Sequence, residues 1–234
     1  MRAVIFDWGG TLTPWRSVDP GHGWRAYADV VHAEQPERAG ELAVRLLAAE
    51  DAAWARTRAD SSAFTFASVL AACGIDEHPD AVRSFRTFWE PSTYTDPDVA
   101  TVLTELRQRG LRTGVLSSTS WPGAWHEEIL RRDGVLDHFD ACVWSSQLAW
   151  TKPHPEAFRA AMHAVGVDDP AECVYVGDRL YDDISGAKGV GMRAVLVPHS
   201  KIPPEQLTAV DVEPDAVIDR LTDLLALVDN WLAA

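Results

Sequence analysis

Beyond residue 95 the sequence alternates between amphipathic helical segments and short apolar runs, and this alternation restricts the chain to an α/β fold. The short runs have the length of buried strands, whereas the segments between them repeat their apolar residues at helical spacing. Such alternation is typical of a parallel sheet whose strands are joined by right-handed helical crossovers. The expected helices span residues 97–109, 122–132, 155–165, 181–189 and 219–232, and the expected strands span residues 112–117, 139–144, 172–177, 193–197 and 215–218.

The N-terminal part of the chain adds one more strand and a block of helices. Residues 2–6 form an apolar run that ends at Asp7, which is the pattern of a buried central strand. Residues 8–23 are rich in glycine and proline and predict a loop or an irregular flap. Residues 24–90 carry only helical signals, and the helices expected there span residues 36–59, 62–73 and 79–89.

The helical block is therefore an insertion between the first and second strands of an α/β core. We expect a core domain formed by residues 1–13 and 93–234. Residues 14–92 are expected to form a helical cap domain together with the flap.

Polar residues stand directly after four of the predicted strands. They are Asp7, Ser117, Ser118, Ser145, Ser146 and Asp178. In an open parallel sheet, ligands bind beyond the carboxyl ends of the strands. The sequence therefore predicts a binding site at this edge, built from carboxylates and hydroxyls.

Four short motifs occur in order along the chain. They are Asp7-Trp-Gly-Gly-Thr-Leu-Thr, Ser117-Ser-Thr, Lys152-Pro, and Val-Gly-Asp178 followed by Asp182-Asp183. Each motif alone is a weak signal, but the ordered set resembles the four motifs of the haloacid dehalogenase-like hydrolase superfamily. The resemblance implies a Rossmann-like parallel sheet core, and the helical insertion falls where members with an all-helical cap carry theirs.

The resemblance also implies a role for several polar side chains. Asp7 would be the nucleophile, a carboxylate that forms a covalent aspartyl intermediate and so divides one difficult step into two. Ser117 would bind the phosphoryl group, and Ser118 would either assist it or cap the next helix. Thr11 would contact the transferred group or brace its loop. Lys152 would neutralise negative charge beside the nucleophile.

A magnesium site is implied by the same motifs. Asp7 and Asp178 would hold one Mg²⁺, a hard ion that prefers oxygen ligands. The backbone carbonyl of Gly9 would add a further ligand, and Asp183 would bind the metal through water or orient the lysine. Asp182 is expected to face solvent on the following helix.

Motif one departs from the usual pattern of the superfamily's phosphatases at a single position. These enzymes usually read Asp-x-Asp, and the second aspartate protonates the leaving group and then activates water. Gly9 stands at that position in this chain. Because general acid–base groups typically contribute about 10²- to 10⁴-fold, the resemblance implies weakened proton transfer.

Two other branches of the superfamily also lack that aspartate. Haloacid dehalogenases use no metal and carry a Ser-Asn element near motif four, whereas this chain keeps Val-Gly-Asp178. Arg38 could imitate a halide-binding arginine, although an exposed helix residue is the expected reading. Phosphonoacetaldehyde hydrolases need a Schiff-base lysine in the cap, and residues 14–92 contain no lysine, which excludes that chemistry.

Three functions stay open on these grounds. The first is a Mg²⁺-dependent phosphohydrolase that acts on a small phosphorylated metabolite through an aspartyl-phosphate intermediate. The second is a metal-independent 2-haloacid dehalogenase. The third is a low-turnover protein that binds a phosphorylated ligand and serves as a regulator.

The flap offers candidates for the missing proton-transfer group and for substrate contacts. His22 and Asp19 are the nearest acid–base residues, although turn chemistry is the expected role of both. Closure of the insertion over the site would exclude water. Candidate substrate contacts are Trp8, Trp15, Arg16 and Arg25.

Composition disfavours nucleic acid and a membrane as partners. The formal net charge of −14 disfavours nucleic acid, which needs a basic face. No apolar run approaches the roughly 20 residues that span a bilayer. The widely spaced Cys73, Cys142 and Cys173 indicate free thiols in a reducing compartment. We therefore expect a cytoplasmic monomer or homodimer whose partner is a small-molecule phosphorylated substrate.

Overall fold

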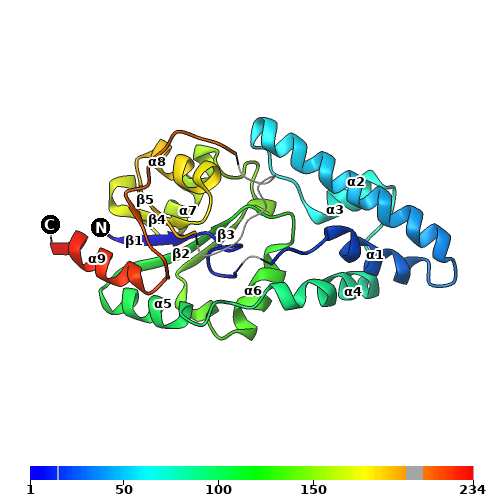
Figure 1. Ribbon diagram of the computed structural model, residues 1–234, viewed down its shortest axis with the longest axis horizontal. Coiled ribbons are helices and arrows are strands. Elements are labelled where there is room, and N and C mark those ends of the chain that lie inside the picture. Colours follow the sequence, from blue (N-terminus) through cyan, green and yellow to red (C-terminus); the bar gives the residue numbers. More distant parts are fainter. Residues whose placement is uncertain (15, 199–207, 234) are drawn as a thin grey trace.

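The computed structural model describes residues 1–14, 16–198 and 208–233, and a six-stranded sheet forms its centre (Figure 1). The strands are β1 Ala3–Phe6, β2 Arg112–Ser117, β3 Ala141–Trp144, β4 Cys173–Gly177, β5 Arg193–Leu196 and β6 Ala216–Val217. Their spatial order is β3-β2-β1-β4-β5-β6, and every neighbouring pair is parallel. The predicted α/β fold with a parallel sheet is therefore confirmed.

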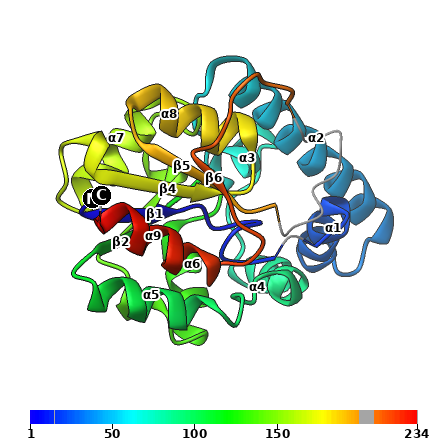
Figure 2. The same cartoon turned by 60° about the vertical axis from the view of Figure 1, so that its left-hand side comes forward.

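Helices cover both faces of the sheet, as Figure 2 shows. Side chains of β1 alternate between the two faces, as expected for a strand. Ala3 and Ile5 pack in one apolar cluster with residues of α7 (Pro155–Ala164) and α8 (Gly186–Val190). Val4 and Phe6 pack in the other cluster, with residues of α5 (Val99–Gln108), α6 (Gly123–Arg132) and α9 (Asp223–Ala233). Because β1 is fully buried, it holds the residue that follows it in a fixed position.

Four helices gather at the end of the sheet that lies away from the two termini (Figure 1). They are α1 Pro20–Val31, α2 Pro36–Asp60, α3 Phe66–Ala72 and α4 Pro79–Trp89. They enclose an apolar cluster of their own that includes Trp24, Tyr27, Phe66 and Phe85, and the rings of Trp24 and Phe66 stack at 5.2 Å. Since Trp125 of α6 also belongs to this cluster, the helical layer packs directly on the α/β layer.

The segment between α2 and α3 is hydrogen-bonded to the α/β layer. Ser62 forms an antiparallel bridge with Trp150. The amide of Ala63 donates to the carbonyl of Ala149 at 3.0 Å, and the amide of Thr151 donates to the carbonyl of Ser61 at 2.9 Å. We call residues 61–66 the tether, because the amide of Phe66 also donates to the carbonyl of Ser120, at 2.6 Å.

The observed elements depart from the expected ones in several places, three of which have a local reason. Helix α1 begins at Pro20, within the expected irregular flap, because Asp19 caps it by accepting a hydrogen bond from the amide of Gly21 at 2.8 Å. Helix α3 begins at Phe66 rather than at residue 62, since Thr65 forms a capping box with Ser68. The expected helix 181–189 divides into a π-helical turn, Leu180–Ser185, followed by α8.

Other features of the chain agree with the sequence. Cys73, Cys142 and Cys173 are free thiols. Within the described ranges, no helix combines the length and apolar character needed to cross a membrane. The division into a core domain (1–13 and 93–234) and a cap domain (14–92) stays a prediction.

Candidate active site

Asp7 lies at the carboxyl edge of the sheet, between two other polar strand ends. It follows β1, and its amide donates to the carbonyl of Val176 at 2.9 Å. Because β1 pairs with β2 on one side and with β4 on the other, Ser117 at the end of β2 and Asp178 after β4 flank it. The strand order therefore brings together residues that are more than 100 positions apart in the chain.

Lys152 connects two of the predicted carboxylates. Its Nζ donates to Oδ1 of Asp7 and to Oδ1 of Asp183, both at 2.6 Å. The side chains of all three residues are buried, with exposed fractions of 3% for Lys152, 7% for Asp7 and 1% for Asp183. Water screens such pairs little, so the ammonium holds both carboxylates firmly in place.

Asp183 also organises the loop that follows β4. Its Oδ2 accepts hydrogen bonds from the amide of Asp178 at 3.1 Å and from the amide of Arg179 at 2.9 Å. A Cβ atom on Gly177 would lie 2.4 Å from Asp183, so only glycine allows this close approach. Asp183 thus fixes the backbone that carries Asp178.

Three carboxylates at this edge have the geometry of a metal site. Ligand oxygens of Asp7, Asp178 and Asp183 lie within 4.8 Å of one another. One oxygen of Asp178, Oδ2, is buried without a hydrogen-bond partner among the described residues. Gly10 faces that oxygen with φ of +98°, and a Cβ atom there would lie 2.1 Å from it. A buried, unpaired carboxylate oxygen beside two further carboxylates fits a hard cation such as Mg²⁺.

The charge balance of the site supports the same conclusion. Burial raises the pKa of Asp7 to about 6, although the charge of Lys152 opposes this. Burial, together with the charges of Asp7 and Asp183, raises the pKa of Asp178 to about 8. Burial lowers the pKa of Lys152, but the two carboxylates outweigh it and the pKa lies well above its usual value. One ammonium is therefore too little positive charge for three carboxylates.

The predicted hydroxyl groups lie in the loops at the strand ends, and one of them contacts this cluster. Thr11 Oγ1 donates to Oδ1 of Asp178 at 3.4 Å, so Thr11 braces the acidic cluster. Ser118 accepts a hydrogen bond from Thr151 Oγ1 at 2.5 Å. Ser117 is buried, with 3% of its surface exposed. Ser145 exchanges two hydrogen bonds with the backbone of Thr119, at 2.8 and 3.0 Å, and so braces the loop after β2.

A cavity of about 750 Å³ adjoins the cluster and reaches the helical layer. Its lining includes Asp7, Gly9, Ser117, Ser118 and Lys152 from the predicted site. From the helices and the loops it adds Arg16, Glu50, Asp51, Trp54, Arg58, Trp89, Trp121, His126, Arg179, Tyr181 and Asp182.

Several candidate residues lie elsewhere or outside the described ranges. Asp19 caps α1, and His22 packs edge-on against Phe88 at 6.3 Å, and neither lines the cavity. Arg25 pairs with Asp29 on the surface, and Arg38 is exposed on α2. Trp15 lies outside the residues that the structure describes.

Two further expectations concern positions 182 and 9. Asp182 is half-buried, pairs with Arg179 at 3.8 Å and lines the cavity, so the expectation that it faces open solvent is wrong. The role of the Gly9 carbonyl as a metal ligand stays a prediction.

Sequence reasoning missed His126, which lines the cavity with only 1% of its surface exposed. Its Nε2 lies 2.9 Å from Thr119 Oγ1, and its ring stacks on Trp144 at 4.3 Å and meets the edge of Trp8 at 4.5 Å. The available signal was its place three residues before Ile129, on the apolar face of the expected helix 122–132.

Comparison with known proteins identifies the family. The family model described as haloacid dehalogenase-like hydrolase matches residues 1–191. A glyceraldehyde 3-phosphate phosphatase of Methanopyrus kandleri is 34% identical over 167 residues, which is 70% of each chain. The human haloacid dehalogenase-like hydrolase domain-containing protein 3 is 32% identical over 155 residues, which is 64% of this chain and 59% of that protein.

Solved structures share the fold over nearly the whole chain. A phosphatase of this superfamily from Thermococcus onnurineus superposes with a TM-score of 0.69 at 24% identity, covering 97% of this chain and 98% of that one. A 2-haloacid dehalogenase from Pseudomonas syringae reaches 0.68 at 24% identity, covering 99% of both chains. At 24% identity, these two structures support the fold and nothing beyond it. Because the family model matches residues 1–191 and the archaeal relative is 34% identical over 70% of each chain, the chain belongs to the haloacid dehalogenase-like hydrolase family.

Proposed function

We propose that this protein is a Mg²⁺-dependent phosphohydrolase that acts on a small phosphorylated metabolite through an aspartyl-phosphate intermediate. One observation carries the proposal: Lys152 bridges Asp7 and Asp183 beside an unpaired buried oxygen of Asp178. A relative named glyceraldehyde 3-phosphate phosphatase supports a phosphate ester as the substrate. We assign the cation to Asp7, Asp178, Asp183 and the carbonyl of Gly9.

The proposed chemistry divides between the metal and the protein. Mg²⁺ bound there would polarise the phosphoryl oxygens and offset their negative charge. The lysine donates to Oδ1 of Asp7, and we assign Oδ2 as the attacking atom. Oδ1 has a second lone pair and could also bind the cation. Its positive charge also opposes the rise in the pKa of Asp7 that burial causes, and so favours the ionised nucleophile.

Two displacements at phosphorus complete the proposed reaction. Asp7 Oδ2 forms a bond to phosphorus while the bond to the alcohol oxygen of the substrate breaks, and that oxygen takes a proton from solvent. Water then attacks the aspartyl phosphate, which releases inorganic phosphate and restores the Asp7 carboxylate. The buried hydroxyl of Ser117 would hold a phosphoryl oxygen during both steps.

Proton transfer to the leaving group is expected to be slow, because Gly9 has no side chain that could donate a proton. Apart from its chain neighbours, no described residue has a heavy atom within 4 Å of a Cβ atom placed on Gly9, so a side chain can begin there without a clash. We expect Gly9→Asp to raise turnover of an alkyl phosphate, whose leaving group needs a proton, by about tenfold or more. Unchanged turnover with normal Mg²⁺ binding would show that another residue already transfers the proton.

The proposal is tested by a panel of phosphorylated metabolites and 2-haloacids, assayed with Mg²⁺ and with a chelator. We expect phosphate release that depends on Mg²⁺ and is lost in Asp7→Asn. Asp19→Asn is the matched control, because asparagine caps a helix as well as aspartate does. Halide release that resists the chelator would support 2-haloacid dehalogenation instead. Phosphate-ester binding without turnover would support a regulatory protein.

A further inference from the structure

We propose that the substrate's leaving group carries a flat aromatic or heteroaromatic ring, so that the ring is recognised by indole side chains of the cavity. This inference rests on the proposed phosphohydrolase activity and names the class of its substrate. It differs from the three-carbon substrate in the name of the archaeal relative.

The first argument is the size of the cavity. Its volume is about 750 Å³, within the range of pockets that enclose drug-sized ligands. A triose phosphate has about ten non-hydrogen atoms, which fill less than about 300 Å³ even at the roughly 30 Å³ that one water molecule occupies in the liquid. More than half of the cavity would then hold water against its walls. A larger leaving group removes that water.

The second argument is the chemistry of the walls. Five aromatic side chains from separate segments line the cavity: Trp8, Trp54, Trp89, Trp121 and Tyr181. All but Trp8 are half-buried, so each keeps some surface for a ligand. Burial of such rings against a flat ring is favourable, and stacked or edge-to-face pairs add about 0.5–1.5 kcal/mol each. The hydroxyls of a short polar chain would leave most of the carbon surface of these rings without a partner, whereas a flat ring would cover it.

The third argument is the rigidity of the wall at Trp121. Its indole meets His126 at 5.6 Å, Trp89 at 5.8 Å, and Phe85 and Trp125 at 6.0 Å. Four ring contacts leave the side chain little freedom. A ring fixed before binding loses little conformational entropy when the ligand arrives, which favours affinity.

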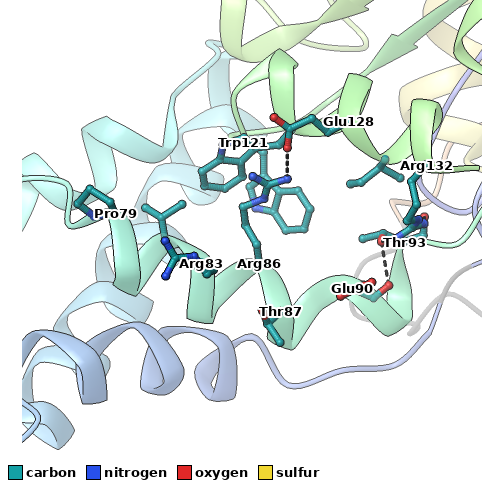
Figure 3. A pocket seen from close by; sticks show the side chains of 12 residues that line it. Pro79, Arg83, Arg86, Thr87, Glu90, Thr93, Trp121, Glu128 and Arg132 are labelled. Carbon is teal, nitrogen blue, oxygen red and sulfur yellow. Dashed lines mark hydrogen bonds and ion pairs between the residues drawn. The ribbon is translucent and has the colours of Figure 1, made fainter.

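A second, smaller pocket also borders Trp121. It measures about 400 Å³, lies between α4 and α6, and shares Trp121 and Thr93 with the cavity (Figure 3). Arg86 of α4 reaches across it to pair with Glu128 of α6, as the dashed line in Figure 3 shows. Because this arginine is already paired with a carboxylate, the smaller pocket offers a phosphate less than the cluster at Asp7 does.

The test compares substrates that differ in the ring but not in the leaving-group chemistry. Phenylethyl phosphate and propyl phosphate both release a primary alcohol, so the lack of an acid–base side chain at position 9 affects both substrates equally. With Mg²⁺ present, we expect kcat/KM for phenylethyl phosphate to exceed that for propyl phosphate and for glyceraldehyde 3-phosphate by about tenfold or more. Trp54→Ala should reduce the ratio, while Trp231→Ala, which removes a half-buried indole on the distant α9, should leave it unchanged.

The outcomes separate this inference from the proposed function. Equal kcat/KM for the ring-bearing and ring-free phosphates, or a preference for the triose, overturns the ring proposal and leaves the phosphohydrolase standing. If folded Trp54→Ala keeps the wild-type ratio, the indole of Trp54 does not recognise the ring, which contradicts that part of the proposal. No phosphate release from any ester overturns both. The wild-type ratio decides the question even if a variant folds poorly.

Discussion

At the scale of single residues, the buried cluster at Asp7 contains one ammonium that attracts two carboxylates and a third carboxylate, Asp178, that both of them repel. Lys152 compensates Asp7 and Asp183 through hydrogen bonds of 2.6 Å. Among the described residues, Oδ2 of Asp178 has no hydrogen-bond partner, and the pKa of Asp178 is raised to about 8 by burial first and by the neighbouring carboxylates second. A residue in such an environment favours either a proton or a metal ion. A cation bound at the acidic cluster would supply the missing positive charge.

A substitution of Gly10 tests whether the acidic cluster binds a cation. A methyl group there would lie 2.1 Å from Asp178 Oδ2 and would displace the carboxylate. We expect Gly10→Ala to weaken Mg²⁺ binding by roughly 10- to 100-fold, as measured by titration calorimetry. Gly74→Ala is the control, because Gly74 also has positive φ, +69°, but apart from its chain neighbours no described residue lies within 4 Å of its added Cβ. The control should lose about 1–2 kcal/mol of stability and keep its Mg²⁺ affinity. Equal Mg²⁺ affinities in the two variants would contradict the assignment.

His126 predicts how stability depends on pH. Burial lowers the pKa of His126 from 6.5 to about 3. The unfolded chain takes up a proton at this residue below about pH 6.5, whereas the folded protein does not until about pH 3. Its contribution to the free energy of unfolding is therefore complete above pH 6.5 and falls by about 1.4 kcal/mol per pH unit between pH 6 and pH 4.

The measurement is urea unfolding of the wild type and of His126→Gln over this pH range. The variant should lack that part of the slope, whereas His163→Gln, which removes an exposed histidine, should keep it. Parallel slopes for the wild type and His126→Gln would show that another group dominates the acid sensitivity.

At the scale of elements, the tether links the helical layer to the α/β layer by backbone hydrogen bonds. Its amides of Ala63 and Phe66 donate to the carbonyls of Ala149 and Ser120, and Thr151 donates back to Ser61. These contacts adjoin Lys152 on one side and the Ser117-Ser118 loop on the other. Each such hydrogen bond contributes about 1 kcal/mol, so rotation of the helices away from the sheet must break several of them together.

Hydrogen exchange can detect whether the tether stays closed. We expect the amides of Ala63, Phe66 and Thr151 to exchange more than about 100-fold more slowly than an unstructured amide. Ser17 is the reference within the protein, because its amide donates to no other described residue. Exchange at the three tether amides as fast as at Ser17 would show that this junction opens freely, and the helices would then move as a lid.

At the scale of the whole molecule, a formal net charge of −14 accompanies an acidic cluster at the sheet edge. A cation that binds the folded state and not the unfolded chain stabilises the fold by mass action. At a Mg²⁺ concentration 100 times its Kd the gain is about 2.7 kcal/mol. For a domain of this size that corresponds to a rise in Tm of roughly 5–11 °C.

Thermal unfolding with Mg²⁺, with a chelator, and with NaCl at matched ionic strength separates specific binding from screening of the net charge. The rise in Tm should require Mg²⁺, and Asp178→Asn should abolish it. If NaCl reproduces the rise, or if Asp178→Asn retains it, the stabilisation arises from general screening.

Local patterns located most elements of this fold. Strand β2 and helix α4 match their expected ranges, because the apolar period and the flanking glycine or proline act within a few residues. The start of helix α1 was not predicted, since the four residues from Pro20 to Gly23 look irregular in isolation and become helical only with the cap at Asp19 and the packing of Trp24.

The motif residues and their order along the chain are properties of the sequence alone, and they were sufficient to predict the parallel fold and the carboxylate edge. The tertiary structure decided which of them touch. Lys152 contacts Asp7 across 145 positions, and Trp54 of α2 reaches the same cavity as Trp121 and His126 at the start of α6. Such contacts depend on strand order and on the packing of one layer against another. These arise from non-local burial of apolar surface, which no short window of sequence encodes.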